Sequence, residues 1–362
     1  MGAVVATVNE RPPATTIAAI VTRACAATLL PHARTAAQWD ELLADDAVLR
    51  AGVTAIAQRH GARHDAPRRF DSGSLPVYAL DGGATVLKLY PPHERGHAEV
   101  EARALAFVEG RLPIATPRVL ATGVQDGWPY LLMSHLAGRR LVEAWPGLTA
   151  TDRDRIADAL GAALAALHDL DIAPLQDLPP AWDGFIAAQR RRAVRQQRER
   201  GLARGWLAQV EPFLDAWAPP APARRVLLHT ELMREHLMVD ATGALCGLFD
   251  FEPAMVGDPA YDFASVGLFV SCGDRRLLHR TLCAYGEPGG AGGAVDTHPC
   301  RLMAHALLHR YSNLRWYLQR LPVPGATTLE QLAQAWWGRS ASTNTSPKTA
   351  TDRNLAPRTG NC

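Results

Sequence analysis

VLLHTELMREHLMVDATGALCGLFDFEPAMVGDPAYDF, residues 226–263, is the most informative stretch of this 362-residue chain. It covers all but the first residue of two apolar runs that are typical of strands, Arg225–Leu228 and Leu245–Phe249. Each run leads to a carboxylate, Glu231 after the first and Asp250 after the second, and the turn residues at 240–243 predict a hairpin that brings both strand ends to one edge. Two carboxylates and the imidazole of His236 at that edge predict a site for metal and phosphate, of the kind that phosphoryl transfer requires.

The composition is typical of a chain that buries the cores of two modest domains. Hydrophobic residues make up 48% of it, and the net charge of +2 implies no polyanion-binding surface. The six cysteines form no C-x-x-C pair, which favours reduced thiols and a cytoplasmic location. No apolar run reaches the length of a membrane span, and Thr15–Leu30 contains Arg23 and lacks a basic segment before it. Neither a membrane association nor a signal peptide is therefore expected.

The two ends of the chain are expected to be disordered. Residues 1–37 show no clear periodicity, and residues 339–362 are rich in Ser, Thr, Asn and Pro. In the arginine-rich stretch Asp183–Trp217 no aromatic residue lies among the arginines at 190–200, so we interpret it as a solvated helix face and expect no nucleic-acid partner. The sequence gives no indication of oligomeric state.

A single lysine stands out in the body of the chain. Of 38 Lys and Arg residues only two are lysines, Lys348 in the C-terminal tail and Lys88 in the apolar run VLKLY. A central apolar strand is a poor place for a solvated charge. An ammonium group is a compact charge suited to phosphate oxygens, so we predict a functional role for Lys88.

The pattern around Lys88 predicts a small sheet-containing lobe followed by a helical one. A small-residue turn at Phe70–Pro76 precedes strands at 77–80 and 85–90, a helix follows at 97–109, and further strands are expected at 113–120 and 130–134, which gives a five-stranded lobe ending near Ser134. Helices are expected at 37–59, 151–168, 183–217, 264–282, 300–320 and 328–337.

The order of these features resembles the aminoglycoside phosphotransferase family, which has a protein-kinase-like fold. The resemblance covers about residues 38–338 and is carried by PVYAL and VLKLY (76–90), WPYLLMSHLAG (128–138), the helix ending ALH (166–168), DF followed by GDPAY (250–261), and LAQAWWG (332–338). It is most similar to the hygromycin B kinases that act on the 7″ hydroxyl. It implies an α+β fold of two lobes: an antiparallel-sheet, nucleotide-binding N-lobe over 38–134 and a mainly helical C-lobe over 135–338.

The resemblance also implies roles for individual residues. Lys88 would hold the phosphates of ATP or GTP and pair with Glu101, for which Glu99 is the rival. Asp250 would bind Mg²⁺, His229 would brace the catalytic loop, and Asp262 would anchor it. The remaining nucleotide-binding residues would be a loop over the phosphates (Ser72, Gly73, Ser74), a hinge that bonds adenine (Met133, Ser134, His135, Leu136), and two leucines that sandwich the base (Leu131, Leu248).

Two positions depart from the family pattern. The family usually has Asp where this chain has Glu231, and Asn as a metal ligand where it has His236. Three accounts fit: Glu231 is the catalytic base and His236 lines the site; Glu231 binds metal with Asp250 and Glu252 while His236 is the base; or the protein binds nucleotide without turnover. The longer side chain of Glu231 could displace the base by about 1 Å and cost roughly 100-fold in rate.

The sequence thus predicts a kinase that phosphorylates a hydroxyl of a small molecule, with an aminocyclitol antibiotic such as hygromycin B as the expected acceptor. The amines of such an acceptor would be held by acidic side chains, for which the candidates are Asp183, Glu235, Glu252 and Asp274. The arginine-rich helix argues against a strongly cationic acceptor, so another hydroxylated metabolite remains an alternative.

Overall fold

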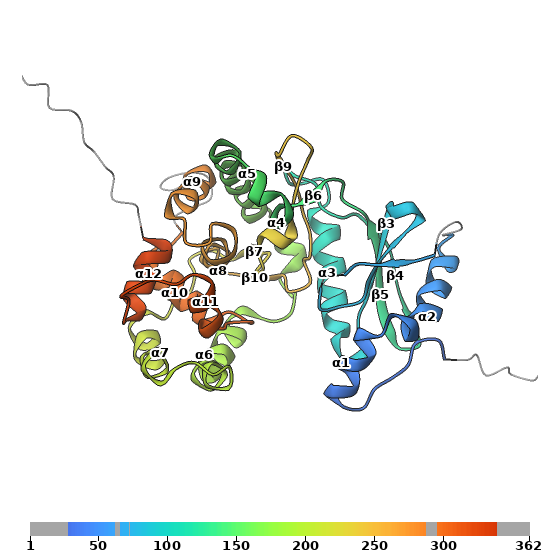
Figure 1. Ribbon diagram of the computed structural model, residues 1–362, viewed down its shortest axis with the longest axis horizontal. Coiled ribbons are helices and arrows are strands. Elements are labelled where there is room, and N and C mark those ends of the chain that lie inside the picture. The colour runs from blue at the N-terminus through green and yellow to red at the C-terminus, as the bar shows by residue number, and fades with distance from the viewer. Residues whose placement is uncertain (1–27, 62–65, 72, 287–294, 339–362) are drawn as a thin grey trace, which may run out of the picture.

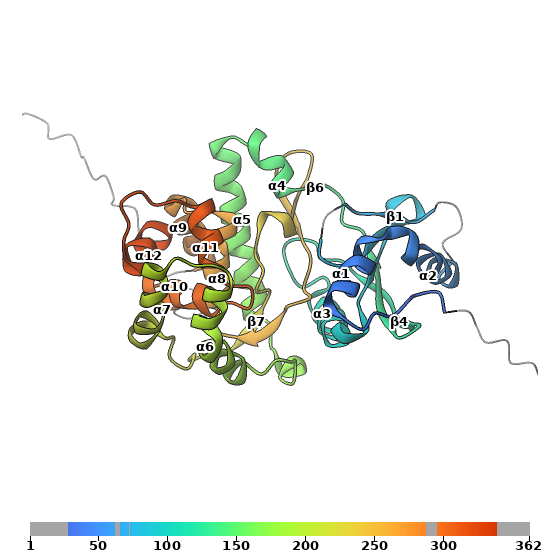
Figure 2. The ribbon, with the colours of Figure 1, turned by 60° about the horizontal axis from the view of Figure 1, so that its bottom comes forward.

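A computed structural model describes residues 28–61, 66–71, 73–286 and 295–338. It has two lobes, which lie side by side in both ribbon views (Figures 1 and 2). The first is built on a five-stranded antiparallel sheet of order β1-β2-β3-β5-β4, and the second is mainly helical, as expected. The N-lobe strands are β1 (Arg68–Arg69), β2 (Val77–Leu80), β3 (Thr85–Leu89), β4 (Val119–Gln125) and β5 (Trp128–Ser134).

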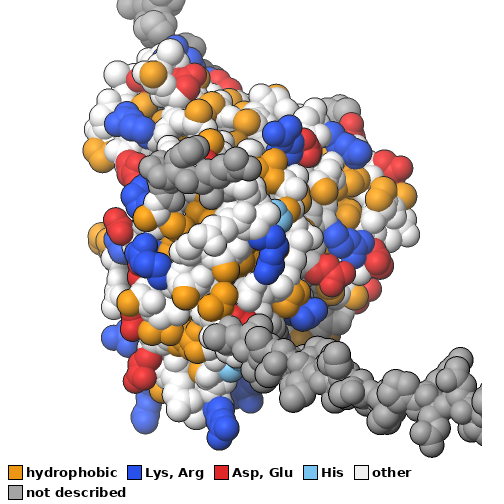
Figure 3. Space-filling view, turned by 90° about the vertical axis from the view of Figure 1, so that its right-hand side faces the viewer, with side chains coloured by type: hydrophobic (Ala, Val, Ile, Leu, Met, Phe, Trp, Pro, Cys, Tyr) orange, Lys and Arg blue, Asp and Glu red, His pale blue; other side chains and the backbone are white. Residues whose placement is uncertain are grey.

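Alternation along the strands gives the N-lobe two apolar faces. Tyr78, Leu87 and Leu89 pack with residues of α2 (Asp46–Arg59) on one face, and α1 (Ala36–Ala44) precedes α2 on the same side. The other face, which carries Val86 and Tyr90, packs with α3 (Arg95–Val108). Because Lys88 lies between Val86 and Tyr90 at a spacing of two, it faces α3 rather than solvent. The outer end of this lobe carries acidic and basic side chains interspersed among hydrophobic ones (Figure 3).

The N-lobe begins earlier in the chain than expected. Leu30 is buried in the core beside α2, and the main-chain N–H groups of Leu29 and Leu30 donate to the carboxylate of Asp126. Residues 28–37 therefore belong to the folded lobe and not to an extension. Residues 1–27 and 339–362, for which disorder was expected, lie outside the described residues.

The C-lobe is built mainly from helices. The long α5 packs closely on α9, and the two lie beside each other in Figure 1. The helices of this lobe are α4 (Leu141–Ala144), α5 (Ala150–Asp169), α6 (Trp182–Glu199), α7 (Arg204–Trp217), α8 (Ala260–Ser265) with a π turn at Val266–Val270, α9 (Arg275–Tyr285), α10 (Pro299–Leu308), α11 (Leu314–Arg320) and α12 (Leu329–Trp337).

Several expected helices are divided in two, each at a residue that ends or caps a helix. Asp45 caps α2 through the N–H of Ala47, and Gly201, at φ 74°, lies between α6 and α7. Asp274 caps α9, and Asn313 caps α11. The capping residues can be found in the sequence, but apolar periodicity continues on both sides of each break. It therefore predicted one long helix at each of these places.

The strand pairing around the central stretch differs from the prediction. The expected hairpin partners 225–228 and 245–249 do not pair: β7 (Val226–Leu228) pairs with β10 (Met255–Gly257), and the hairpin is formed by β8 (Leu237–Val239) and β9 (Leu245–Leu248) with β6 (Arg139–Arg140). The short run after His236 supplies the first hairpin strand because it directly precedes the turn at 240–243. Residues 113–118, also expected as strand, precede β4, although Ala115 exchanges main-chain hydrogen bonds with the β9 strand.

Candidate active site

Lys88 lies at the centre of a cluster of three carboxylates drawn from both lobes. Its Nζ is 2.8 Å from Glu101 on α3, 2.7 Å from Asp250 after β9, and 3.0 Å from Glu252. The side chain is only 7% exposed. Burial alone lowers the pKa of Lys88, but the surrounding carboxylates outweigh burial and hold the pKa well above its ordinary value. The lysine is therefore a fixed positive charge at the junction of the lobes.

Glu101, and not its rival Glu99, is the helix partner of Lys88. Glu101 is buried, whereas Glu99 is exposed. The hydroxyl of Tyr90 also donates to Glu101 Oε2. Tyr90 follows Lys88 by two residues on the same strand and so shares its face, a relation that the period of the strand could have revealed.

Asp250 and Glu252 reach the lysine from the C-lobe. Burial raises the pKa of Asp250, but Lys88 outweighs this effect and holds the pKa below its ordinary value. Glu252 behaves similarly, because contact with His97, 3.3 Å away, and with Lys88 opposes the effect of burial on its pKa. His97 was not predicted, although it precedes Glu101 by one helical turn and therefore lies on the same face of α3. Both carboxylates are ionised at neutral pH.

The loop that carries Glu231 is held in a strained conformation. Thr230 has φ 71°, a left-handed conformation that is costly for a β-branched residue. The main-chain N–H groups of His229 and Thr230 donate to the two oxygens of Asp262, at 3.0 and 2.7 Å, and the carbonyl of Thr230 accepts from Ser265 and His309. These buried contacts over-determine the loop. They agree with the anchoring role that was expected of Asp262.

His229 is a structural imidazole, as the resemblance implied. It is buried, and its Nε2 lies 2.9 Å from the carbonyl of Phe249, directly before Asp250. Burial lowers the pKa of His229 to about 4, so it is neutral and Nε2 donates to that carbonyl. The contact ties the Glu231 loop to the Asp250 strand.

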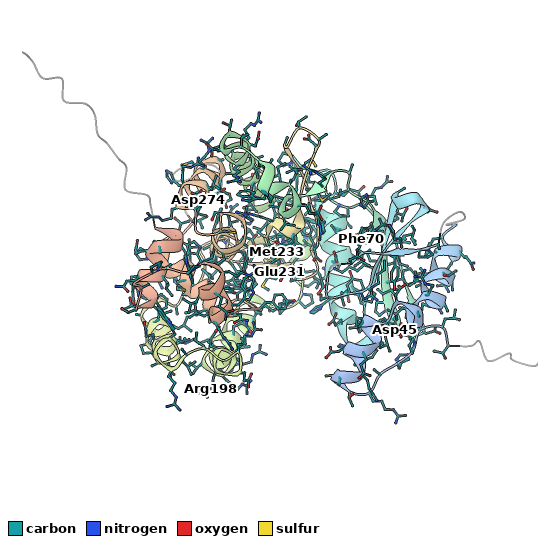
Figure 4. All side chains as sticks on the ribbon, in the orientation of Figure 1. Asp45, Phe70, Arg198, Glu231, Met233 and Asp274 are labelled. Atoms are coloured by element: carbon teal, nitrogen blue, oxygen red, sulfur yellow. The ribbon has the colours of Figure 1, made fainter. Side chains whose placement is uncertain are left out.

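Glu231 differs from the other carboxylates of the site. Among the described residues none donates a hydrogen bond to its side chain, and burial, reinforced by Asp250 and Glu252 against the effect of His236, raises its pKa to about 7. Glu231 lies near the junction of the lobes, with Met233 beside it (Figure 4). A carboxylate with a pKa near 7 is suited to accept a proton at neutral pH.

Both ring nitrogens of His236 are engaged. Nδ1 lies 2.9 Å from the main-chain oxygen of Glu231, which can only accept, so Nδ1 carries a proton. Nε2 lies 3.2 Å from Asp250 Oδ2. Ligand atoms of Glu231, His236 and Asp250 all lie within 4.8 Å of one another. The position that usually holds Asn thus places an imidazole against the second oxygen of Asp250.

A cavity of about 570 Å³ runs from this cluster to the end of β5. The expected loop and hinge residues line it: Gly73, Ser74, Met133, Ser134, His135 and Leu136. Ser72, the third loop residue, lies outside the described residues. The expected sandwich of Leu131 and Leu248 is wrong, since both are buried in the core and Val86 and Met238 line the cavity instead. Leu131 lies opposite Lys88 on the same face of the sheet as Val86 and Met133, but it is fully buried and does not line the cavity.

The four acidic candidates for holding an acceptor are not brought together. Glu252 belongs to the lysine cluster, and Glu235 lines the nucleotide-sized cavity. Asp183 is 73% exposed and pairs with Arg225, and Asp274 caps α9 and does not line the cavity (Figure 4). Asp183 and Asp274 thus make other contacts. They were predicted as acceptor-binding residues because sequence position alone does not show which helix ends face the site.

Comparison with known proteins agrees with this geometry. The model of the phosphotransferase enzyme family (APH) matches residues 67–296, more than half of the chain. The chain belongs to this phosphotransferase family. The match spans Lys88, Glu231 and Asp250, and it shows an enzyme that transfers phosphate to a hydroxyl.

Solved structures share the fold of this phosphotransferase. Macrolide 2′-phosphotransferase MphH from Brachybacterium faecium is 23% identical, with a TM-score of 0.53 over 79% of this chain and 97% of that one. Aminoglycoside 2′-phosphotransferase-IIIa, solved with GDP, is 17% identical, with a TM-score of 0.60 over 79% and 98%. APH(2″)-IIa, solved with streptomycin and ATP, is 16% identical, with a TM-score of 0.54 over 79% and 97%. The kinase-like, two-lobed fold is therefore shown, and family membership supports nucleotide use.

The donor set of this phosphotransferase fits a divalent cation. Asp250 supplies carboxylate oxygens, and the Nδ1–H of His236 donates to a carbonyl, as metal-ligating histidines usually do, which leaves Nε2 as the ligand atom. Glu252 adds a second carboxylate within reach of Asp250. Mg²⁺ prefers oxygen ligands, whereas Mn²⁺ and Co²⁺ accept imidazole more readily.

No helix among the described residues combines the length and the apolar character that crossing a membrane requires.

Proposed function

We propose that this phosphotransferase transfers the γ-phosphoryl group of ATP or GTP to a hydroxyl of a small molecule. The observation that carries the proposal is the convergence of Lys88 from the N-lobe with Asp250 and Glu252 from the C-lobe, all within 3.0 Å of the lysine nitrogen at one end of the cavity. Phosphoryl transfer depends mainly on positioning and on neutralising phosphate charge. A cation and carboxylates supplied by opposite lobes meet both needs.

The remaining parts of the cavity fit a nucleotide. Gly73 and Ser74 line the cavity, and their main-chain N–H groups and the Ser74 hydroxyl could bind phosphate oxygens there. Met133–Leu136 lie where β5 leaves the sheet, and Val86 and Met238 offer apolar surfaces to a base. Lys88, held between Glu101 and Asp250, would exchange part of its contact with Asp250 for phosphate oxygens.

Asp250 and His236, with Glu252, would hold a divalent cation, Mg²⁺ or Mn²⁺, which neutralises charge on the phosphate oxygens when bound. The chain itself fixes both ligands. The carbonyl of Glu231 orients the His236 ring, and Lys88 holds the other oxygen of Asp250.

We assign the role of general base to Glu231. Its carboxylate has no competing hydrogen bond from a described residue, and its pKa of about 7 lets it take the proton from an acceptor hydroxyl near neutral pH. His236 is less suited, because both of its nitrogens are engaged. The supports of the loop from Asp262 and His309 favour an intact catalytic loop over one that has lost turnover.

Hygromycin B remains the acceptor that the sequence resemblance favours, and the family also supports other antibiotics or hydroxylated metabolites. The test is mass spectrometry of acceptors incubated with the protein, ATP or GTP, and Mg²⁺. We expect a gain of one phosphoryl group that is lost in Lys88→Ala and Asp250→Asn. Asp274→Asn is the matched control, since it makes the same chemical change at a residue that does not line the cavity and Asn also caps helices. Nucleotide binding without transfer to any acceptor in a broad panel would refute the proposal.

A further inference from the structure

A second cavity adjoins the catalytic cluster on the other side of Glu252. Its volume is about 610 Å³, and its walls come from the start of α3, the Pro179–Pro180 segment, α6, and Arg310 just after α10. Glu252 lines both this cavity and the nucleotide-sized one. A molecule in the second cavity would therefore lie next to the phosphates, on the side from which a hydroxyl could approach them.

Some of the arginines that line this second cavity have no carboxylate partner among the described residues. Its carboxylates are both paired with cations: Glu252 with Lys88 and His97, and Glu199 with Arg195 at 3.8 Å. The guanidinium groups of Arg192 and Arg310 lie within 4.0 Å of no carboxylate among the described residues. Arg192 contacts the neutral oxygens of Ala188 and Gln189, and Arg310 lies 5.7 Å above the ring of Phe185. Two positive charges are thus left for whatever occupies the cavity.

Arg310 connects this charge to the chemistry. It directly follows His309, whose Nε2 lies 3.0 Å from the carbonyl of Thr230, the residue before Glu231. Arg310 is half-buried, and its main-chain N–H donates to the Tyr261 hydroxyl, while its guanidinium lies over the Phe185 ring. A planar guanidinium is suited to bidentate binding of an oxyanion. An ammonium group in the same place would meet like charge.

We propose that the acceptor of this enzyme carries an oxyanion group, such as a carboxylate or phosphate, which Arg192 and Arg310 bind while its hydroxyl lies toward Glu231. The inference rests on the proposed phosphotransfer and narrows its acceptor from any hydroxylated molecule to an acidic one. It also runs against a polycationic acceptor, because the two carboxylates that line the cavity, Glu199 and Glu252, already contact cationic side chains.

The test uses compounds with one disaccharide skeleton and different charges: lactobionate, lactose 1-phosphate, neutral lactitol, and cationic 1-amino-1-deoxylactitol. Binding to the full-length protein is measured by calorimetry or saturation-transfer NMR at constant ionic strength. We expect the acidic compounds to bind at least about tenfold more tightly than lactitol, and the amine to bind most weakly. The better of lactobionate and lactose 1-phosphate identifies the oxyanion.

Arg192→Gln and Arg310→Gln should each remove most of this preference. Arg198→Gln is the matched control, because Arg198 is exposed on the same helix and lies away from the cavity (Figure 4). Arg192 is exposed, so its substitution leaves the core intact even if Arg310→Gln destabilises the fold. Tighter binding of the amine, no preference for acidic compounds, or an equal loss in Arg198→Gln would overturn the inference.

The binding arms separate this inference from the proposed function. Arginine-dependent binding of acidic compounds without phosphate transfer would leave the anion site standing and count against the transfer. Phosphoryl transfer to neutral or cationic acceptors that is unchanged in both arginine variants would support the proposed function and overturn the anion site.

Discussion

Replacing Glu231 with Gln should stabilise the protein and remove its activity, because the same burial that suits the carboxylate to catalysis makes its charge costly. The pKa of Glu231 is raised from 4.5 to about 7. One pKa unit corresponds to about 1.4 kcal/mol, so keeping Glu231 ionised in the folded protein costs at most about 3.5 kcal/mol. Gln has a similar shape and no charge.

The sign follows from proton binding. Between pH 4.5 and about 7 the folded protein retains a proton on Glu231 that the unfolded chain has released. This contribution to stability is fully present below pH 4.5 and is lost as the pH rises through 7. The stability gained by Glu231→Gln should therefore be near zero at pH 4.5 and reach about 2–3 kcal/mol at pH 8, a rise of several degrees in Tm.

The assay is thermal and denaturant unfolding of wild type and Glu231→Gln from pH 4.5 to 8, with phosphoryl transfer measured on the same samples. Glu211→Gln, the same chemical change at an exposed position of α7 that lines neither cavity, is the control. Transfer should fall at least about 100-fold in Glu231→Gln, and the wild-type rate should fall about tenfold per pH unit below 7. A stability difference that does not change with pH would refute the reasoning about burial, and retained transfer would refute the assignment of the base.

Three further predictions address the other groups. Lys88→Met should weaken nucleotide binding and lower stability, because three carboxylates lose their shared cation. Lys88→Arg should retain part of the stability. Equal unfolding curves for wild type and Lys88→Met would contradict this prediction. Asp262→Ala should cost at least about 2 kcal/mol, since two buried N–H groups lose their acceptor, and should lower kcat more than nucleotide affinity; unchanged kcat would show that the loop needs no anchor. His236→Asn should shift metal preference from Mn²⁺ toward Mg²⁺, which Mn²⁺ binding followed by electron paramagnetic resonance can measure without turnover; an unchanged Mn²⁺ affinity would exclude the imidazole as a ligand.

Much of the site was predictable because its residues are unusual in type for their place. Lys88 on an apolar strand and the carboxylates after the β-type runs can be identified from the sequence alone. The pairing of β7 with β10 was not, because it joins segments on either side of a hairpin, and local pattern does not specify such non-local contacts.

The acceptor side was missed for a different reason. Arg192 looked like part of a solvated helix face, and Arg310 lies more than a hundred positions away in the sequence. Only the packing of α6 beside the catalytic loop places both in one cavity wall. Tyr90 and His97, by contrast, were within reach of simple periodicity arguments from Lys88 and Glu101.

A crystal structure with a non-hydrolysable triphosphate analogue and Mg²⁺ or Mn²⁺ would show whether both lobes bind one nucleotide. We expect phosphate oxygens within about 3 Å of the Lys88 nitrogen, and a cation that contacts both Asp250 and the same nucleotide. A nucleotide bound elsewhere, with Lys88 still enclosed by Glu101, Asp250 and Glu252, would contradict it.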